Sequence, residues 1–333
     1  MSNIPFAKLT YRGQIRRLRG LAEKALTAYQ LGDAHFKLLT YWNNVTFRVD
    51  TAKGRYVLRI NRPGFQDTPA IRSELIWLIA LKQEANLTVP EPIPNRDGEL
   101  LTTVSLAGIP EPRDCVLFRW LNGRFLKKRL NAKSLQLAGV FLAKMHQHAQ
   151  QFILPKGFTR KRWDLNLLMG GEPGIDKSRF DALLSSEEQT VFEAMTQRIE
   201  HELETLGEEP EVFGLIHADF HHGNYLFYRG ELCAIDFDEC GFGHYVYDIA
   251  VVLSGVRRRE EFLVMREAFL KGYRQICRLP ESYEKHIEPL IIARLLMLAI
   301  WWVGISGDSP QHREGAADFA KEVLSETRDF LNQ

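Results

Sequence analysis

The sequence has no excess of charge of either sign and no uninterrupted apolar run long enough to cross a membrane. Its 333 residues include 43 basic and 42 acidic side chains, a formal net charge of +1. This balance creates no field that favours nucleic acid or an anionic membrane, so we expect neither as a partner. No uninterrupted apolar run of about 18 residues occurs, and residues 1–11 lack a secretory core. We therefore expect a cytoplasmic protein.

Cysteine is scarce and lacks the spacing of a metal site. The four cysteines form no CxxC pair, and three of them lie among apolar residues. We expect reduced structural thiols rather than disulfides or zinc ligands. The chain also lacks internal repeats and low-complexity tracts. With 45% hydrophobic and 26% charged residues, it can bury a large core, most naturally as two lobes.

The most informative pattern is the stretch 214–239, GLIHADFHHGNYLFYRGELCAIDFDE. Asp219 precedes Asn224 by five residues, so a short loop can place a proton-accepting carboxylate and a metal-binding amide in one site. Asp236 can reach the same metal from a second element. Phosphoryl transfer requires these groups, and kinases carry His, Asp, Asn and a later Asp in this order. The spacing predicts Asp219 as the catalytic base, with Asn224 and Asp236 as metal ligands.

The flanking residues favour a strand, a loop and a hairpin. Residues 212–216 form an apolar run that predicts a strand leading into the motif. Residues 225–228 and 232–235 predict two further strands, joined by a turn at Arg229 and Gly230. The acidic residues then stand at the ends of these strands.

The histidines of the motif suggest one alternative chemistry. His217, His221 and His222 lie beside Asp219, which is reminiscent of a metal hydrolase. They lack the helical HExxH spacing of the common zinc enzymes, so we favour the kinase interpretation.

The run HADFHHGNYLF…AIDFDECGFGHYVYDIA resembles the catalytic block of the aminoglycoside phosphotransferase and choline kinase superfamily. That superfamily includes type II homoserine kinases, fructosamine kinases and a bacterial stress-response kinase that acts on proteins. The resemblance covers nearly the whole chain, most clearly residues 214–252 and least clearly residues 150–210. It implies an α+β fold, bilobal and protein-kinase-like. Residues 1–120 would form a small antiparallel-sheet lobe ending at the hinge, and residues 121–333 a mainly helical lobe. ATP and Mg²⁺ are the implied cofactors.

The N-terminal lobe is expected to bind the nucleotide. Residues 36–41, 45–50 and 55–60 alternate in polarity as strands do. Between the first two strands, Asn43 and Asn44 stand where protein kinases carry a glycine-rich loop. The resemblance implies that they cover the phosphates. The alternative is an ordinary hairpin turn, which Asn favours.

The third strand departs from the usual kinase pattern. Arg59 occupies the position of the lysine that holds the α- and β-phosphates, and Val57, on the same face, would cap the adenine. A helix should follow, capped by Thr68 and opened by Pro69. It carries Glu74, which the resemblance pairs with Arg59. A solvated arginine and an exposed glutamate are the alternatives.

Residues 115–120 predict the strand that enters the hinge, and the backbone around Phe118, Trp120 and Leu121 would bind adenine. Beyond the hinge the chain should be helical. The sequence predicts helices at residues 134–150, 186–206 and 291–303.

Two features favour a small-molecule acceptor. Ala218 stands where protein kinases place an arginine that recognises an activation-loop phosphate. Only eleven residues separate Asp236 from Asp248, too few for a peptide-docking segment. Asp238 and Glu239 add negative charge, which favours an amine or a polyol acceptor. An amine-containing alcohol, sugar or amino alcohol is therefore our first choice.

Four further residues have a structural and a functional interpretation. Trp301 and Trp302 are of a type usually found in a core, although aromatic rings can also wall a pocket for a cationic acceptor. Asp248 is expected to anchor the catalytic loop from a helix start, and His146 to be a hydrogen-bonded core residue.

Two other functions stay open: a Ser/Thr protein kinase of the bacterial stress-response type, and a catalytically weak nucleotide-binding regulator. The protein would be a monomer or a homodimer.

Overall fold

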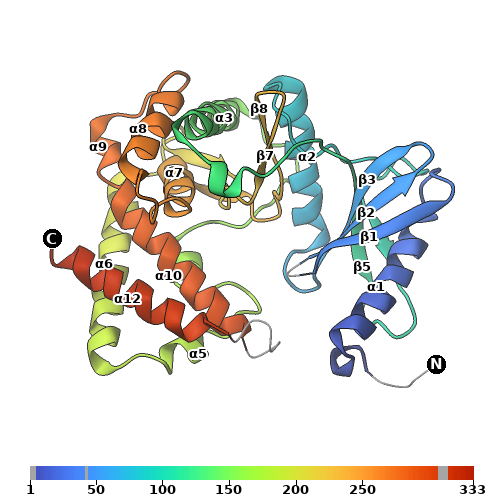
Figure 1. Cartoon of the computed structure of the whole chain (residues 1–333), viewed down its shortest axis with the longest axis horizontal. Coiled ribbons are helices and arrows are strands. Elements are labelled where there is room, and N and C mark those ends of the chain that lie inside the picture. Colours follow the sequence, from blue (N-terminus) through green and yellow to red (C-terminus); the bar gives the residue numbers. More distant parts are fainter. Residues whose placement is uncertain (1–4, 42–43, 307–313) are drawn as a thin grey trace. The chain divides into compact units, whose positions relative to one another are not determined.

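The computed structural model describes residues 5–41, 44–306 and 314–333 and divides the chain into two compact units (Figure 1). The first unit comprises Met1–Asn122 and Pro155–Thr159. The second comprises Gly123–Leu154 and Arg160–Gln333. A sheet-based first unit and a mainly helical second unit confirm the expected α+β class.

The first unit is built on a five-stranded antiparallel sheet in the order β1-β2-β3-β5-β4. Burial alternates along β2, where Val45, Phe47 and Val49 face the core, because successive side chains of a strand point to opposite faces. The three strands predicted before residue 61 are confirmed with small shifts of their ends. The strands are β1 Ala34–Tyr41, β2 Val45–Thr51, β3 Gly54–Ile60, β4 Thr102–Val104 and β5 Arg113–Arg119.

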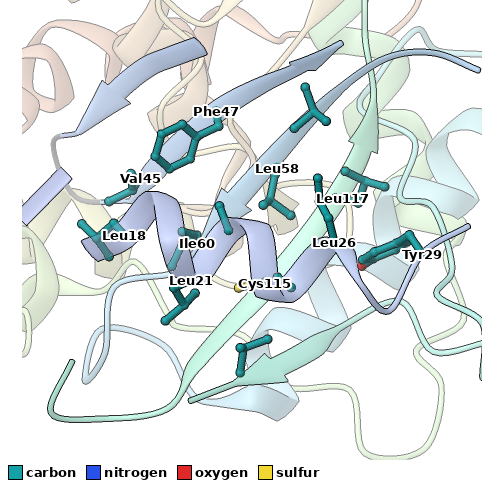
Figure 2. Packing of buried hydrophobic residues seen from close by; sticks show 14 of the residues in the cluster. Leu18, Leu21, Leu26, Tyr29, Val45, Phe47, Leu58, Ile60, Cys115 and Leu117 are labelled. Carbon is teal, nitrogen blue, oxygen red and sulfur yellow. The ribbon is translucent and has the colours of Figure 1, made fainter. Parts of the chain in front are cut away.

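Helix α1 (Tyr11–Leu26) covers one face of this sheet (Figure 2). The Thr10 hydroxyl caps the helix by accepting from the Gly13 amide at 3.2 Å. Leu18 and Leu21 recur at helical spacing and are buried with Leu58 of β3 in one hydrophobic cluster. This helix therefore closes the core of the first unit.

Helix α2 (Thr68–Glu84) corrects one predicted detail, because its N-cap is Asp67 and not Thr68. The Asp67 carboxylate accepts from the Ala70 amide at 2.8 Å. A carboxylate at this end also complements the helix dipole. The Thr68 hydroxyl donates instead to the Asp114 carboxylate at 2.7 Å, which ties α2 to β5. Pro69 lies in the first turn as predicted.

The second unit is mainly helical. Helices α3 and α8 approach closely at two glycines: a Cβ added at Gly139 would lie 2.1 Å from the Phe269 carbonyl, and one at Gly272 would lie 2.1 Å from the Gln136 carbonyl. The helices predicted near 134–150, 186–206 and 291–303 are present. The helices are α3 Ala132–Gln151, α4 Leu165–Leu168, α5 Lys177–Asp181, α6 Ser186–Leu206, α7 Tyr245–Ser254, α8 Phe262–Tyr273, α9 Glu281–Glu284, α10 Ile287–Ile305 and α12 Ala316–Leu331.

Two short antiparallel pairs in the second unit hold the sequence motif. Strand β6 (Phe213–Ile216) pairs with β9 (Gly241–His244), and β7 (Tyr225–Tyr228) pairs with β8 (Glu231–Ala234). The predicted turn at Arg229 and Gly230 closes the β7–β8 hairpin, with φ values of 51° and 88°. Positive φ at both central residues suits a tight hairpin turn.

Helix α10 is strongly apolar, and most of its residues are buried. The stretch Glu281–Ile305 is, among the described residues, the one helical segment long and apolar enough to cross a membrane by length and composition. Of its most apolar window, 78% is buried inside the structure, as in the core helix of a globular protein.

Candidate active site

Asp219 lies in the loop between β6 and β7, and neighbouring side chains hold both of its carboxylate oxygens. The Asn224 amide nitrogen donates to Oδ2 at 2.6 Å and to the Asp219 carbonyl at 3.0 Å. The Arg294 guanidinium forms an ion pair with Oδ1. The Asp219 side chain is still 22% exposed, so an incoming hydroxyl can reach it. The structure thus brings Asp219 and Asn224 together, as their spacing predicts.

The orientation of Asn224 fits a divalent cation. The amide nitrogen of Asn224 faces Asp219, so its amide oxygen points away from that carboxylate. The two acceptor groups therefore do not repel each other. The Ile235 amide donates to the Asn224 carbonyl at 2.8 Å, so Asp236 follows beside Asn224 at the open end of the β7–β8 hairpin. Asp236 is exposed. Two oxygen donors suit Mg²⁺, which takes its other ligands from phosphates and water.

Within the described part of the chain, no three His, Cys, Asp or Glu side chains gather to hold a metal. A cation at Asn224 and Asp236 would therefore depend on a bound nucleotide for further ligands. This is how Mg²⁺ sites in phosphate-transferring enzymes are commonly completed.

Asp248 anchors the catalytic loop from the first turn of α7. Its Oδ2 accepts from the His217 amide at 2.8 Å, and its Oδ1 accepts from the Ala218 amide at 2.7 Å. Its Oδ2 also lies 3.2 Å from His146 Nε2, while His146 Nδ1 lies 2.8 Å from the Tyr273 hydroxyl. Burial lowers the pKa of His146, although Asp248 acts in the opposite direction. The structural roles expected for Asp248 and His146 agree with these contacts.

His217 connects the catalytic loop to the segment that carries Asp236. Its Nδ1 accepts from the Asp219 amide at 3.3 Å, so its Nε2 carries the proton and donates to the Ile235 carbonyl at 3.1 Å. Both ring nitrogens are thus used by the backbone. The metal-ligand role that a hydrolase would give His217 does not fit this geometry.

Besides Arg229 in the hairpin turn, two residues of the motif adopt a backbone conformation that side chains disfavour. Ala218 has a φ of 65° and Asp236 a φ of 67°, both in the left-handed region. Each such residue costs on the order of 1–3 kcal/mol and persists only where its surroundings fix it. The bond from the Ala218 amide to Asp248 is one such constraint. Strain at these two positions is typical of a functional loop.

Arg294, on α10, is a site residue that the motif does not contain. It is 5% exposed and contacts Asp219 through one terminal nitrogen, while its other terminal nitrogen lies 3.5 Å from the Ala218 carbonyl. Burial alone would raise the pKa of Asp219, but the charges of Arg294 and His221 outweigh it and hold that pKa below its usual value. Asp219 is therefore ionised throughout the physiological range.

A signal for Arg294 exists in the sequence. It is the single charged residue between Pro289 and Val303, in an otherwise apolar stretch. A buried charge needs a partner of opposite sign. The sequence alone does not say which acid provides it, because 75 residues separate Arg294 from Asp219.

In the first unit, Arg59 and Glu74 form the predicted ion pair. Both terminal guanidinium nitrogens bind both carboxylate oxygens, each at 2.7 Å. The two side chains are only 5% and 1% exposed. The guanidinium also lies 5.2 Å from the centre of the Phe118 ring. Neither a solvated arginine nor an exposed glutamate describes this pair.

Comparison with known proteins assigns the family. The sequence model described as the phosphotransferase enzyme family matches residues 37–286. The chain belongs to this family. As a phosphotransferase, it is a kinase with an alcohol group as acceptor.

Solved structures and relatives agree with this assignment. The structure of a microcompartment-associated aminopropanol kinase is 29% identical, with a TM-score of 0.83 over 94% of this chain and 98% of that one. An amicoumacin kinase in complex with AMP-PNP, Ca²⁺ and Ami is 22% identical, with a TM-score of 0.78 over 96% and 97%. A homoserine kinase of Rhizobium meliloti is 27% identical over 76% of this chain and 74% of its own length. The phosphotransferase thus resembles kinases of small molecules.

The other residues that we expect to bind the nucleotide belong to the first unit of the phosphotransferase. Asn44 uses its side-chain oxygen to accept from the Arg62 amide at 3.0 Å. Asn43 lies outside the described residues. Val57 pairs with Phe118 across β3 and β5.

At the predicted hinge, the Trp120 amide donates to the Arg55 carbonyl at 3.1 Å. Among the described residues, the Leu121 amide has no backbone acceptor. Leu121 is therefore the better placed of the two to donate to an adenine.

The acidic residues expected near the acceptor are partly used within the fold. Glu239 and Glu172 both pair with Lys161. Burial opposes the charge on Lys161, but the two glutamates outweigh it and raise its pKa. Asp238 is buried, and Arg160 binds its carbonyl. One lysine facing two glutamates leaves an excess negative charge in this cluster.

The two tryptophans of α10 differ in surroundings. The Trp302 ring lies 5.5 Å from the Phe319 ring of α12, and both residues are half-buried. Trp301 follows Arg294 by seven residues, which places both on the same face of the helix about two turns apart. Trp301 is therefore the better candidate for an acceptor wall.

Proposed function

We propose that this kinase transfers the γ-phosphate of ATP, bound with Mg²⁺, to the hydroxyl of a small amino alcohol. The observation that carries the proposal is the Asp219 carboxylate, fixed by Asn224 and Arg294 and yet open to solvent. A carboxylate so placed orients an acceptor hydroxyl and takes its proton late in transfer. The pKa of Asp219 is low, so its carboxylate is a weak base. A weak base accepts the proton late in the transfer, which agrees with this role.

Asn224 and Asp236 would hold the metal. A bound Mg²⁺ neutralises the charge that develops on the β- and γ-phosphate oxygens. Asn224 would contribute in two ways: its nitrogen keeps Asp219 in position, and its oxygen, which points away from that carboxylate, would be available as a metal ligand. Asp248 accepts from the Ala218 amide and His217 accepts from the Asp219 amide. These bonds hold the loop in its strained conformation.

Arg59 would contact the nucleotide phosphates while paired with Glu74. Its two terminal nitrogens already bind Glu74 at 2.7 Å, so the pair resembles the lysine–glutamate pair of protein kinases in role but not in shape. Val57, Phe118, Trp120 and Leu121 would surround the adenine. The solved amicoumacin kinase, crystallised with AMP-PNP and Ca²⁺, supports the use of a nucleotide and a divalent cation.

An amine on the acceptor is supported by charge and by the relatives. The Lys161 cluster carries one more acid than base, and Trp301 offers an aromatic face that attracts a cation. The names aminopropanol kinase and homoserine kinase both denote acceptors with an amine and a hydroxyl.

A protein acceptor is less well supported. The segment after Asp236 passes directly into β9 and α7, and Arg160, Lys161 and Trp163 hold it by hydrogen bonds to Asp238, Glu239 and Cys240. A segment this short and this constrained leaves little backbone to dock a peptide. The regulator alternative is weakened by the intact set of Asp219, Asn224 and Asp236.

The proposal is tested by ADP release from purified protein with Mg·ATP and a panel of acceptors. Aminopropanol and homoserine are compared with propanediol, a matched control without the amine, and with a serine-containing peptide. We expect ADP release to rise with the amino alcohols and not with propanediol. Release stimulated by the peptide alone would contradict the proposal, as would amino-alcohol stimulation that survives in Asp219→Asn.

A further inference from the structure

Arg113, the first residue of β5, is a buried arginine that the proposed function does not use. It is 7% exposed, close to the values of Arg59 and Arg294. Those two arginines are paired with carboxylates. Among the residues that the structure describes, the Arg113 guanidinium has no hydrogen-bond or ion-pair partner, and its Nε is fully buried. Glu111 acts on it only at longer range.

An arginine in this state is energetically unfavourable. Moving a charge out of water is costly unless an opposite charge or hydrogen-bond acceptors replace the water. Among the described residues, the fold supplies such partners for the other three buried arginines, which are Arg59, Arg294 and Arg160, and none for Arg113. Burial accordingly lowers the pKa of Arg113. A ligand with acceptor oxygens would remove this penalty.

A cavity lies beside this side chain. Its volume is about 150 Å³, well above the roughly 10–15 Å³ that one water needs. Arg113, Arg62, Asn61 and Tyr41 supply polar groups to its wall. Leu18, Val45 and Ile60 supply an apolar side, and Figure 2 shows these three near one another, between α1 and the sheet.

The wall of the cavity is held in place by the fold. The Tyr41 hydroxyl donates to Gln14 Oε1 at 2.7 Å, and the Tyr41 ring stacks on Tyr11. The Asn61 side chain donates to the Asp114 carbonyl at 2.8 Å. The positions of the polar groups are therefore fixed before any ligand arrives, which lowers the entropy cost of binding.

The cavity is separate from the proposed nucleotide residues. Along β5, Arg113, Cys115 and Leu117 alternate onto the face that α1 covers. Arg59 pairs with Val116 in the sheet, so it lies on the opposite face. A ligand at Arg113 and a nucleotide at Arg59 would thus occupy different sides of the sheet.

We propose that Arg113, with Arg62, binds a small oxyanion in this cavity of the first unit. The planar guanidinium fork matches two oxygens of a phosphate or a carboxylate. The site lies at the ends of β1 and β3 and adds a binding function beyond phosphoryl transfer.

The test is thermal unfolding of the full-length protein, titrated with inorganic phosphate or with acetate, while Mg·AMP-PNP saturates the nucleotide site. A ligand that binds the folded state raises Tm with concentration. We expect phosphate, acetate or both to raise the Tm of the wild type, and the more effective ion identifies the ligand class. Arg113→Met should require at least about tenfold more anion for the same shift. Arg19→Met, at an exposed arginine of α1, should respond as the wild type does.

The anion-free baseline separates a binding role from a structural one. Because Arg113→Met removes a buried charge without a partner, its Tm in buffer without these anions should equal or exceed that of the wild type. Arg113→Lys keeps the charge but not the fork, so its response should be present and weaker. The proposal fails if the wild type shows no anion response with nucleotide bound, if Arg113→Met responds normally, or if Arg113→Met alone lowers Tm.

Discussion

The two units each contain an arginine–carboxylate pair, and the pairs are closed to different degrees. In the first unit, Arg59 and Glu74 are joined by two bonds of 2.7 Å, and both side chains are almost unexposed. In the second unit, Arg294 contacts only one oxygen of Asp219, whose side chain is 22% exposed. The other oxygen is shared with Asn224.

The difference teaches what each pair can do. A buried bidentate pair fixes the position of two elements, here β3 and α2, and its carboxylate is closed to solvent and therefore to an incoming hydroxyl. The pair Arg294–Asp219, here called the half-open pair, orients a carboxylate while leaving part of it accessible to a reactant. We therefore expect the first pair to determine mainly stability and the second mainly turnover.

The largest expected effect comes from removing the reactive carboxylate. Asp219→Asn keeps the size and one acceptor oxygen, so the protein should fold and bind nucleotide. Phosphoryl transfer should fall by roughly 10²–10⁴, the usual contribution of a general base. The measurements are kcat with the best acceptor and nucleotide affinity by calorimetry. Turnover near that of the wild type would remove Asp219 from this role.

Breaking the closed pair should mainly affect stability. Arg59→Ala leaves Glu74 buried without a partner, which costs about 3–5 kcal/mol, and Glu74→Ala has the converse effect. Denaturant unfolding of both single variants and the double variant gives their coupling energy. The double variant should be far less destabilised than the sum of the singles, because each removes the same pair.

The exposed pair Arg19–Glu23, with side chains 53% and 55% exposed, is the matched control. Its coupling should not exceed about 0.5 kcal/mol. If the Arg59–Glu74 coupling were equally small, the two side chains would not form a stable pair in solution.

The separation of the site residues along the sequence explains how much of the candidate site the sequence predicts. His217, Asp219, Asn224 and Asp236 lie within one short stretch, so turn signals and strand pattern suffice to bring them together. Arg294 comes from a distant helix whose apolar pattern indicates only burial. Its partner is determined by the packing of α10 against the catalytic loop, which local patterns do not encode.

Local competition explains the smaller discrepancies in the first unit. Asp67 and Thr68 are both acceptable N-caps, and the sequence does not show that Asp114 engages the Thr68 hydroxyl. Helix α1 is not among the predicted elements. Its apolar residues do recur at helical spacing, but five basic residues between Arg12 and Lys24 obscure that pattern.

Replacing the arginine of the half-open pair sharpens the comparison. Arg294→Lys keeps the charge near Asp219 but loses the second contact, to the Ala218 carbonyl. We expect kcat to fall about tenfold, which corresponds to about 1.4 kcal/mol. The KM for ATP should change little, since no nucleotide group is removed. The opposite outcome is a loss of stability as large as that of Arg59→Ala, with unchanged kcat in the folded fraction. It would show that both pairs act mainly on stability.

The smallest expected effect is on the pH dependence of stability. The pKa of Asp219 is lower in the folded protein than its ordinary value near 4. A lowered folded pKa contributes stability that is present above the unfolded pKa and is lost as pH falls through the folded pKa. From pH 7 to about pH 5, Asp219 should therefore contribute no change. Below about pH 4, the wild type should lose stability more steeply than Asp219→Asn, which cannot titrate at this position. Unfolding curves of the two proteins measured side by side from pH 7 to pH 3 provide the comparison. Parallel curves over the whole range would show that the Arg294–Asp219 contact does not stabilise the charged carboxylate, and the half-open pair would then have no electrostatic role.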